Sequence, residues 1–261
     1  GGAAGHALVA GVLEHFFPKA VDVPSVTTSS NLQHLTGLYV PTRAPQTTLQ
    51  KLTQLFMPLY RPISVKNPEP GVLELTFPSN PTAPSRWLEI EPNVFQRDDG
   101  KDTLVIKNDN LFLDSVAPKG FVHLNGFQQL FHQLWFPLAC LIILIAATIL
   151  TRVVLRSQAH AYGFWLTLVT TILALVFVVG LVVFLLTGIG ELAYGNVPLL
   201  ITVILAIPLL LIPLTLGEAV FTLLPQAGGT ALMRSSTALV TLATLALLAW
   251  LHYWNLLGWR F

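Results

Sequence analysis

The feature that most constrains the fold is the hydrophobic C-terminal half of the chain. Four long apolar blocks occupy it, at residues 134–150, 164–186, 197–216 and 237–257. The first block reads LWFPLACLIILIAATIL and carries no charge. Because about 17 to 25 apolar residues cross a hydrocarbon core about 30 Å thick, each block is long enough to be a membrane span. The sequence therefore predicts a four-helix transmembrane domain over residues 131–261.

Composition divides the chain into two parts. The 261 residues are 53% hydrophobic and only 10% charged, and most of the charged residues precede residue 120. The net charge of +1, without a Lys/Arg cluster, gives no basic surface for nucleic acid, so no nucleic-acid partner is expected. Cys140 is the single cysteine, which excludes an internal disulfide and a multi-thiolate metal site. We expect this side chain to be a small apolar group that either faces lipid or packs in the helical domain.

The N-terminal segment predicts a helix that needs a partner. Residues 3–17 place apolar side chains at helical spacing, and Pro18 ends the pattern. We interpret residues 1–18 as the terminal helix of a missing upstream domain and residues 19–34 as a linker rich in Ser and Thr. The sequence shows neither an initiator Met nor a signal peptide.

Short β-type runs follow between residues 35 and 125. Eight of them are separated by turn residues such as Asn-Pro, Asp-Asp-Gly and Asn-Asp-Asn, at residues 35–40, 62–66, 72–77, 86–91, 94–97, 103–107, 111–115 and 121–124. Several alternate apolar with polar residues, which indicates a sheet with one buried face. The pattern predicts a small antiparallel β-sheet or half-barrel, and residues 47–60 predict a helix that covers one mouth of it. The fold class expected is an α+β membrane protein.

Basic residues in the short loops predict the orientation. Arg152 and Arg156 lie between the first and second spans, and Arg234 lies between the third and fourth, whereas the intervening loop carries Glu191. Because Lys and Arg mark the cytoplasmic side, the β-domain and the C-terminus are expected on the outer side of a bacterial cytoplasmic membrane. Pro208 and Pro213 predict a kinked third span.

A search for catalytic motifs finds none. The chain has no G-x-S-x-G, S-x-x-K or H-E-x-x-H motif, and its seven histidines are not at metal-ligand spacing. No catalytic residue, cofactor or metal site is therefore assigned.

Acidic groups give three weaker candidates. Glu89 and Glu91, two apart on a predicted strand, share a face that suits general acid/base chemistry or a solvated surface. Residues 98–102, DDGKD, form either a hydrated hairpin tip or a weak cation site. Glu218 lies near the end of the third span, where it is either functional or pairs at the interface with Arg234.

The order of several segments resembles a known family. GHALVAGVLEHFFP, LQHLTGLYVPTRAPQTTLQKL, RWLEIEPNVFQRDDGKDTLVIK, GFVHLNGFQQLFHQLWFPLACL and HYWNLLGWRF follow one another along the chain. Together they resemble the C-terminal half of bacterial membrane-bound serine hydrolases of the β-lactamase and penicillin-binding-protein-like family. That resemblance implies a β-domain opening at residues 35–39, then membrane helices. It also implies a catalytic domain upstream of residue 1 that holds the S-x-x-K and Y-x-N boxes, so no catalytic residue is carried over to this sequence.

Two interpretations follow. In the first, the chain is the membrane-anchoring and accessory portion of an extracytoplasmic serine hydrolase, with the lipid bilayer and the upstream hydrolase domain as its partners. In the second, it is a standalone membrane-anchored binding or sensory module whose β-domain captures a small ligand or partner. An uncovered apolar stripe on residues 3–17 would favour the first interpretation.

Overall fold

The computed structural model describes residues 32–57, 59–114, 120–154, 161–188, 199–223 and 231–258. It divides the chain into two compact units. The barrel unit comprises Gly1–Arg43 and Pro62–His123, and the helical unit comprises Ala44–Arg61 and Leu124–Phe261. The expected terminal helix and most of the expected linker lie outside the described residues.

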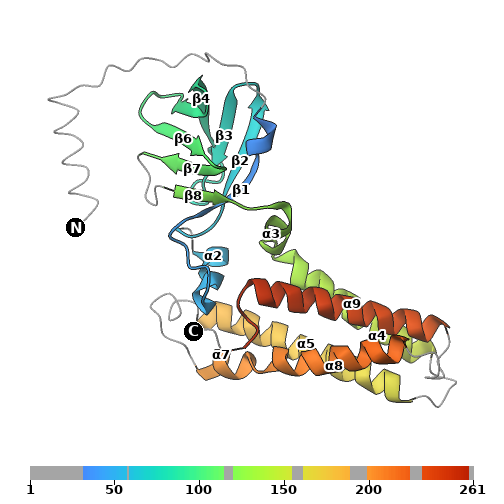
Figure 1. The fold of residues 1–261 in the computed structure, drawn as a ribbon. Helices are drawn as coiled ribbons and strands as arrows, with labels where there is room; N and C mark the ends of the chain where they lie inside the picture. The colour runs from blue at the N-terminus through green and yellow to red at the C-terminus, as the bar shows by residue number, and fades with distance from the viewer. Residues whose placement is uncertain are drawn as a thin grey trace. The chain divides into compact units, whose positions relative to one another are not determined.

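Eight antiparallel strands form the barrel unit (Figure 1). They are β1 (Gly37–Pro41), β2 (Ile63–Glu69), β3 (Val72–Thr76), β4 (Ser85–Glu91), β5 (Val94–Arg97), β6 (Thr103–Lys107), β7 (Asn110–Leu113) and β8 (Gly120–His123). Each strand pairs with the next one along the chain. All eight predicted runs are confirmed as strands, with ends that differ by a few residues.

The prediction of an open sheet or half-barrel was wrong, because the strands close into a complete barrel. β1 pairs with β8 through Tyr39↔His123, Val40↔Val122 and Pro41↔Phe121. This pairing joins segments about 80 residues apart, so no local pattern signals it. Closure satisfies the backbone groups that an open sheet would leave at its edges.

Large side chains fill the interior of the barrel. Tyr39, Trp87 and Phe95 are each almost completely buried, and they pack in one apolar cluster with aliphatic residues of the same strands. β6 shows the underlying alternation, since Leu104 and Ile106 point inward. An eight-stranded barrel is just wide enough for side chains to occupy its interior, and here they do so.

The segment from Leu35 to Tyr39 shows how the chain enters the first strand of the barrel. Gly37 has φ +142°, a backbone conformation that favours glycine. The Tyr39 hydroxyl donates a hydrogen bond of 2.9 Å to the carbonyl of Leu35, at the end of helix η1 (Gln33–Leu35). Burial, with a smaller contribution from Asp109, raises the pKa of Tyr39 to about 12. These residues hold the chain at the barrel entrance and have a structural role.

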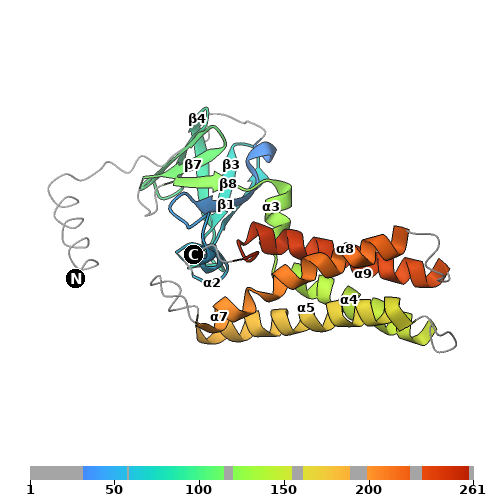
Figure 2. The same ribbon diagram turned by 60° about the horizontal axis from the view of Figure 1, so that its bottom comes forward.

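The helical unit is built from two parts of the chain: a short segment between strands β1 and β2, and a longer part that follows β8. The short segment comprises η2 (Leu49–Leu52) and α2 (Thr53–Phe56). The rest comprises α3 (Gly126–Phe131), α4 (Trp135–Val154), α5 (Ala161–Thr187), α7 (Leu199–Ile204), α8 (Ile207–Leu223) and α9 (Ala231–Tyr253). Helices α4 and α8 each pack against both α5 and α9, and the helices lie side by side in Figure 2.

The prediction of a four-helix transmembrane bundle was also wrong. Three helical stretches in the described residues are long and apolar enough to cross a membrane: Phe164–Thr187, Leu199–Leu223 and Arg234–Tyr253. The apolar part of α4, Trp135–Leu150, is shorter. At about 1.5 Å per residue this part spans about 24 Å, less than the hydrocarbon thickness of about 30 Å.

Proline interrupts the stretch Leu199–Leu223, as predicted. Helix α7 ends at Ile204 and α8 begins at Ile207, directly before Pro208. Proline lacks an N–H, and the N–H groups of the first helical turn have no partner within the helix, so proline is tolerated in the first turn of a new helix. Pro213 lies inside α8.

Residues 47–60 differ from the prediction that they form one helix covering the sheet. The described part forms the short helices η2 and α2. Leu49, Leu52 and Leu55 belong to the same apolar cluster as the buried side chains of α4, α5 and α9. The apolar stripe seen in the sequence is real, but its packing partners are the helices that follow the barrel.

Candidate functional site: an aromatic clamp beside an apolar cavity

A buried lysine lies at the centre of an aromatic cluster in the helical unit. Lys51 Nζ lies 3.5 Å from the centroid of the Tyr253 ring and 5.6 Å from that of Trp254. It also donates a hydrogen bond of 2.7 Å to the Tyr253 carbonyl, at the C-terminal end of α9. Both contacts favour a cation, because the ring faces and the helix C-terminus carry partial negative charge. Burial lowers the pKa of Lys51 to about 8.

His132, directly after α3, contacts the same aromatic residues. Its Nδ1 lies 3.0 Å from the Gln128 carbonyl and 3.3 Å from the Tyr253 hydroxyl, and its Nε2 lies 3.4 Å from Gln54 Oε1. Burial lowers the pKa of His132 to about 4, the nearby charge of Lys51 acts in the same direction, and the bond to Gln128 opposes them. At neutral pH the imidazole is therefore uncharged.

Two tryptophans donate hydrogen bonds to the same backbone carbonyl, that of the residue before His132. The indole N–H groups of Trp250 and Trp254 each donate a hydrogen bond of 3.0 Å to the carbonyl of Phe131. Asn255, with φ +57°, follows and donates its side-chain amide to the carbonyls of Gln46 and Thr48. We call Lys51, Phe131, His132, Trp250, Tyr253 and Trp254 the aromatic clamp. It ties η2, α3 and the end of α9 together.

Protonation of His132 is expected to weaken the helical unit in acid. Between pH 6.5 and about 4, the unfolded chain binds a proton at this ring that the folded chain does not bind. The free energy of unfolding should therefore fall as the pH falls through this window, by up to about 3 kcal/mol. The measurement is the thermal midpoint of the detergent-solubilised protein against pH, for the wild type and for His132→Asn.

The difference between those two pH profiles isolates His132 from the other titrating groups. His34→Gln, which changes an exposed histidine of the barrel unit, is the matched control and should keep the wild-type profile. Identical profiles for the wild type and His132→Asn would contradict the assignment of this acid sensitivity to the clamp.

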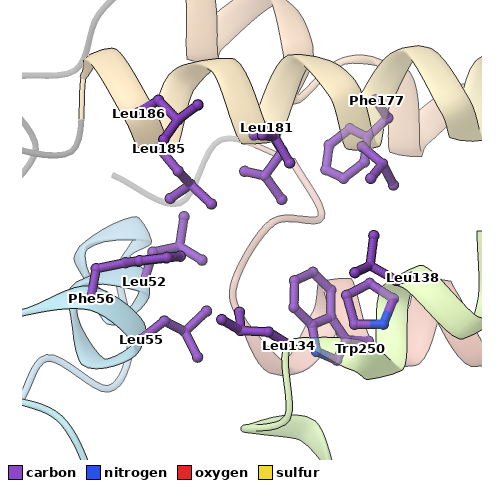
Figure 3. Close-up of a pocket in the computed structure, with 13 residues that line it drawn as sticks. Leu52, Leu55, Phe56, Leu134, Leu138, Phe177, Leu181, Leu185, Leu186 and Trp250 are labelled. Atoms are coloured by element: carbon purple, nitrogen blue, oxygen red, sulfur yellow. The ribbon is translucent and has the colours of Figure 1, made fainter. Parts of the chain in front are cut away.

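An apolar cavity of about 240 Å³ lies beside the clamp and shares Trp250 with it (Figure 3). Its walls come from η2 and α2, from the chain entering α4 and its first turn, and from the second half of α5. The lining residues are Leu52, Leu55, Phe56, Leu134, Pro137, Leu138, Phe177, Val178, Leu181, Val182, Leu185, Leu186 and Trp250. The labelled side chains point toward a common space in Figure 3. The cavity offers apolar contact and no charged group.

The polar groups of the clamp have partners within the protein. The two ring nitrogens of His132 face carbonyl oxygens and a tyrosine hydroxyl, so they have partners already. Cys140 is buried in the apolar core of the helical unit, as expected for a packing side chain. Among the residues that the structure describes, no three His, Cys, Asp or Glu side chains are grouped as metal ligands.

Glu89 and Glu91 do not share a face, contrary to the prediction. The pairing of β4 with β5 shifts register between them, so that Glu89 is buried and Glu91 is exposed. Glu89 Oε1 accepts a long hydrogen bond of 3.4 Å from the backbone N–H of Asn93. A β-bulge at this point removes both the acid/base pair and the solvated strand face that the spacing suggested.

Two of the three carboxylates in the loop at residues 98–102 are paired with Arg97. The Arg97 guanidinium forms ion pairs with both Asp99 and Asp102. The hydrogen bond from Arg97 lowers the pKa of Asp99 despite a small opposing effect of burial. Since these carboxylates already hold an arginine, the hairpin interpretation fits the loop and a cation site does not.

Glu218 is completely buried in α8, and among the residues that the structure describes neither of its carboxyl oxygens has a hydrogen-bond partner. The expected ion pair with Arg234 is not formed, and Arg234 has other interactions. Thr170 lies on the facing helix α5, but its hydroxyl donates to the Leu166 carbonyl at 3.0 Å. Glu191 and Arg156 lie outside the described residues.

Sequence reasoning missed the clamp because it treated the clamp's residues one at a time. A signal was present in FHQLW at residues 131–135 and WLHYW at residues 250–254, two short segments dense in aromatic side chains that hold five of the six clamp residues. No family model, no curated protein and no solved structure matches this chain.

Proposed function

We propose that this chain is the membrane-anchoring and accessory portion of an extracytoplasmic serine hydrolase whose catalytic residues are not in this sequence. The observation that carries the anchoring role is the apolar outer surface of the helices. Large aliphatic side chains are exposed along α5, α8 and α9, for example Val179, Leu210 and Leu242. A contiguous exposed apolar surface of this extent requires a partner, and a bilayer supplies one.

The hydrolase link is supported by the family resemblance of the motifs and by the chemistry of the site. Within the described residues, the clamp and the cavity contain no serine, threonine or cysteine side chain, which is consistent with an accessory role. The Arg residues of the short loops support an orientation with the barrel unit and the C-terminus outside the bacterial cytoplasmic membrane.

The alternative, ligand capture by the barrel, has less support. Tyr39, Trp87 and Phe95 fill the interior, which leaves the outer surface for contacts. That surface carries a small apolar patch of Val105, Phe112 and Val122 on β6, β7 and β8. Such a patch suits contact with a neighbouring protein domain, as expected of an accessory unit.

The test combines membrane extraction with active-site labelling of the native protein. We expect the protein to stay in the membrane pellet after an alkaline carbonate wash. We also expect covalent labelling by a fluorescent fluorophosphonate probe at a mass well above the 28.5 kDa of this chain. Pretreatment with an unlabelled serine-hydrolase inhibitor is the control and should remove the signal.

Two other outcomes separate the parts of this proposal. A membrane-retained protein of 28.5 kDa without labelling would leave the anchoring role and overturn the hydrolase link. Release into the carbonate supernatant would overturn the anchoring role itself.

A further inference from the structure

We propose that the apolar cavity beside the clamp binds one acyl chain of a membrane phospholipid. This inference rests on the proposed membrane location, because acyl chains are abundant only there. It adds a specific lipid site to a unit that would otherwise serve as an anchor alone.

The shape of the cavity supports an occupant that enters from the bilayer. Its floor is made of fully buried side chains, among them Leu52, Phe177 and Trp250. Its rim is exposed, with Leu134 48% and Leu186 80% accessible. The cavity therefore opens on the same apolar surface that the proposed function places against lipid, so acyl chains are the molecules in front of its mouth.

The chemistry of the lining excludes water and polar ligands. Every lining side chain is apolar except for the indole N–H of Trp250, and that group donates to the Phe131 carbonyl. A water molecule needs two to four polar partners, and an apolar cavity without them stays dry. An apolar cavity of about 150 Å³ is enough to accept benzene, so about 240 Å³ accepts a longer stretch of hydrocarbon.

Two segments distant in sequence form the entrance. Phe56 comes from α2 and Leu186 from α5, and both are exposed at the rim. An acyl chain between them would connect η2 and α2 with the long helix α5 through dispersion contacts, and would bury apolar surface on both sides. Bound lipid is therefore expected to raise the free energy of unfolding of the helical unit.

The experiment uses the full chain reconstituted in phosphatidylcholine vesicles that contain a small fraction of phospholipid with a diazirine in the middle of one acyl chain. After irradiation, labelled positions are mapped by peptide mass spectrometry. We expect preferred labelling of cavity residues such as Leu181 and Trp250 over outward residues of α5 such as Val176, which is exposed and outside the lining.

Three variants make the test specific. Leu181→Trp fills the floor and should reduce cavity labelling at least tenfold. Leu134→Trp should give the same result by blocking the mouth without disturbing the core, which keeps the test valid if Leu181→Trp fails to fold. Val176→Trp adds the same side chain on the outer surface of α5 and should leave cavity labelling unchanged.

Even labelling along α5, unchanged by Leu181→Trp and Leu134→Trp, would overturn the acyl-chain site while leaving the membrane location intact. A cross-link between two copies of the chain through cavity residues would also overturn it, because a second copy would then be the occupant. Absence of labelling throughout the helices would instead contradict the membrane location on which the inference rests.

Discussion

Replacing Trp254 by alanine is expected to lower the free energy of unfolding of the helical unit by about 3–5 kcal/mol. The indole is 0% exposed, donates to the Phe131 carbonyl, and contacts the rings of His132 and Tyr253 at centroid distances of 4.9 and 5.2 Å. Its removal leaves a cavity in the clamp and takes away one of the two donors to that carbonyl. Thermal unfolding in detergent should show a midpoint lower by roughly 6–20 °C.

Trp165→Ala is the matched control, because Trp165 lies in α5 with 58% of its surface exposed. We expect its midpoint to stay close to that of the wild type, since exposed substitutions change the free energy of unfolding by about 0.5 kcal/mol or less. Equal losses in the two variants would mean that the clamp does not hold the helical unit together.

Replacing Val122 by proline is expected to open the barrel and to cost about 3 kcal/mol or more of its stability. Val122 lies in β8, where it pairs with Val40 of β1 on one side and with Asn110 of β7 on the other. Proline removes the backbone N–H from a strand that is paired along both edges. Denaturant unfolding followed by the β-sheet circular dichroism signal measures the loss.

Val122→Thr is the control for the side chain itself. The valine side chain is 44% exposed, and threonine keeps both its shape and its preference for strands. The barrel should therefore keep its stability in this variant. Wild-type stability for Val122→Pro would contradict the closure between β1 and β8.

The sequence was most informative where structure depends on neighbours along the chain. The alternation in residues 72–76 and 103–107 and the turn residues between them were enough to place the strands β3 and β6. Pro208 and Pro213 were enough to predict a kink in the stretch that α7 and α8 now form, although not which of the two prolines marks the break. In both cases the deciding interaction, the pleat of a strand or the missing N–H of proline, is local.

The rest depended on contacts between distant segments. Closure of the barrel joins Val40 to Val122, and the clamp joins Lys51 to Tyr253, separated by 202 positions. One bulge between Glu89 and Glu91 reverses the side on which the second carboxylate lies, and a two-residue spacing cannot reveal it. The residues of the candidate site could each be seen in the sequence, but their grouping into one site could not be predicted from it.

The closed barrel also limits how another protein can recognise this unit. Each of the eight described strands is hydrogen-bonded on both sides, so none offers a free main-chain ladder to an incoming extended peptide. Recognition by strand addition, which depends on backbone complementarity and tolerates varied sequence, therefore has no template in these strands. A partner must instead read outward side chains such as Phe112, and this makes the contact selective for the shape and composition of that partner's surface.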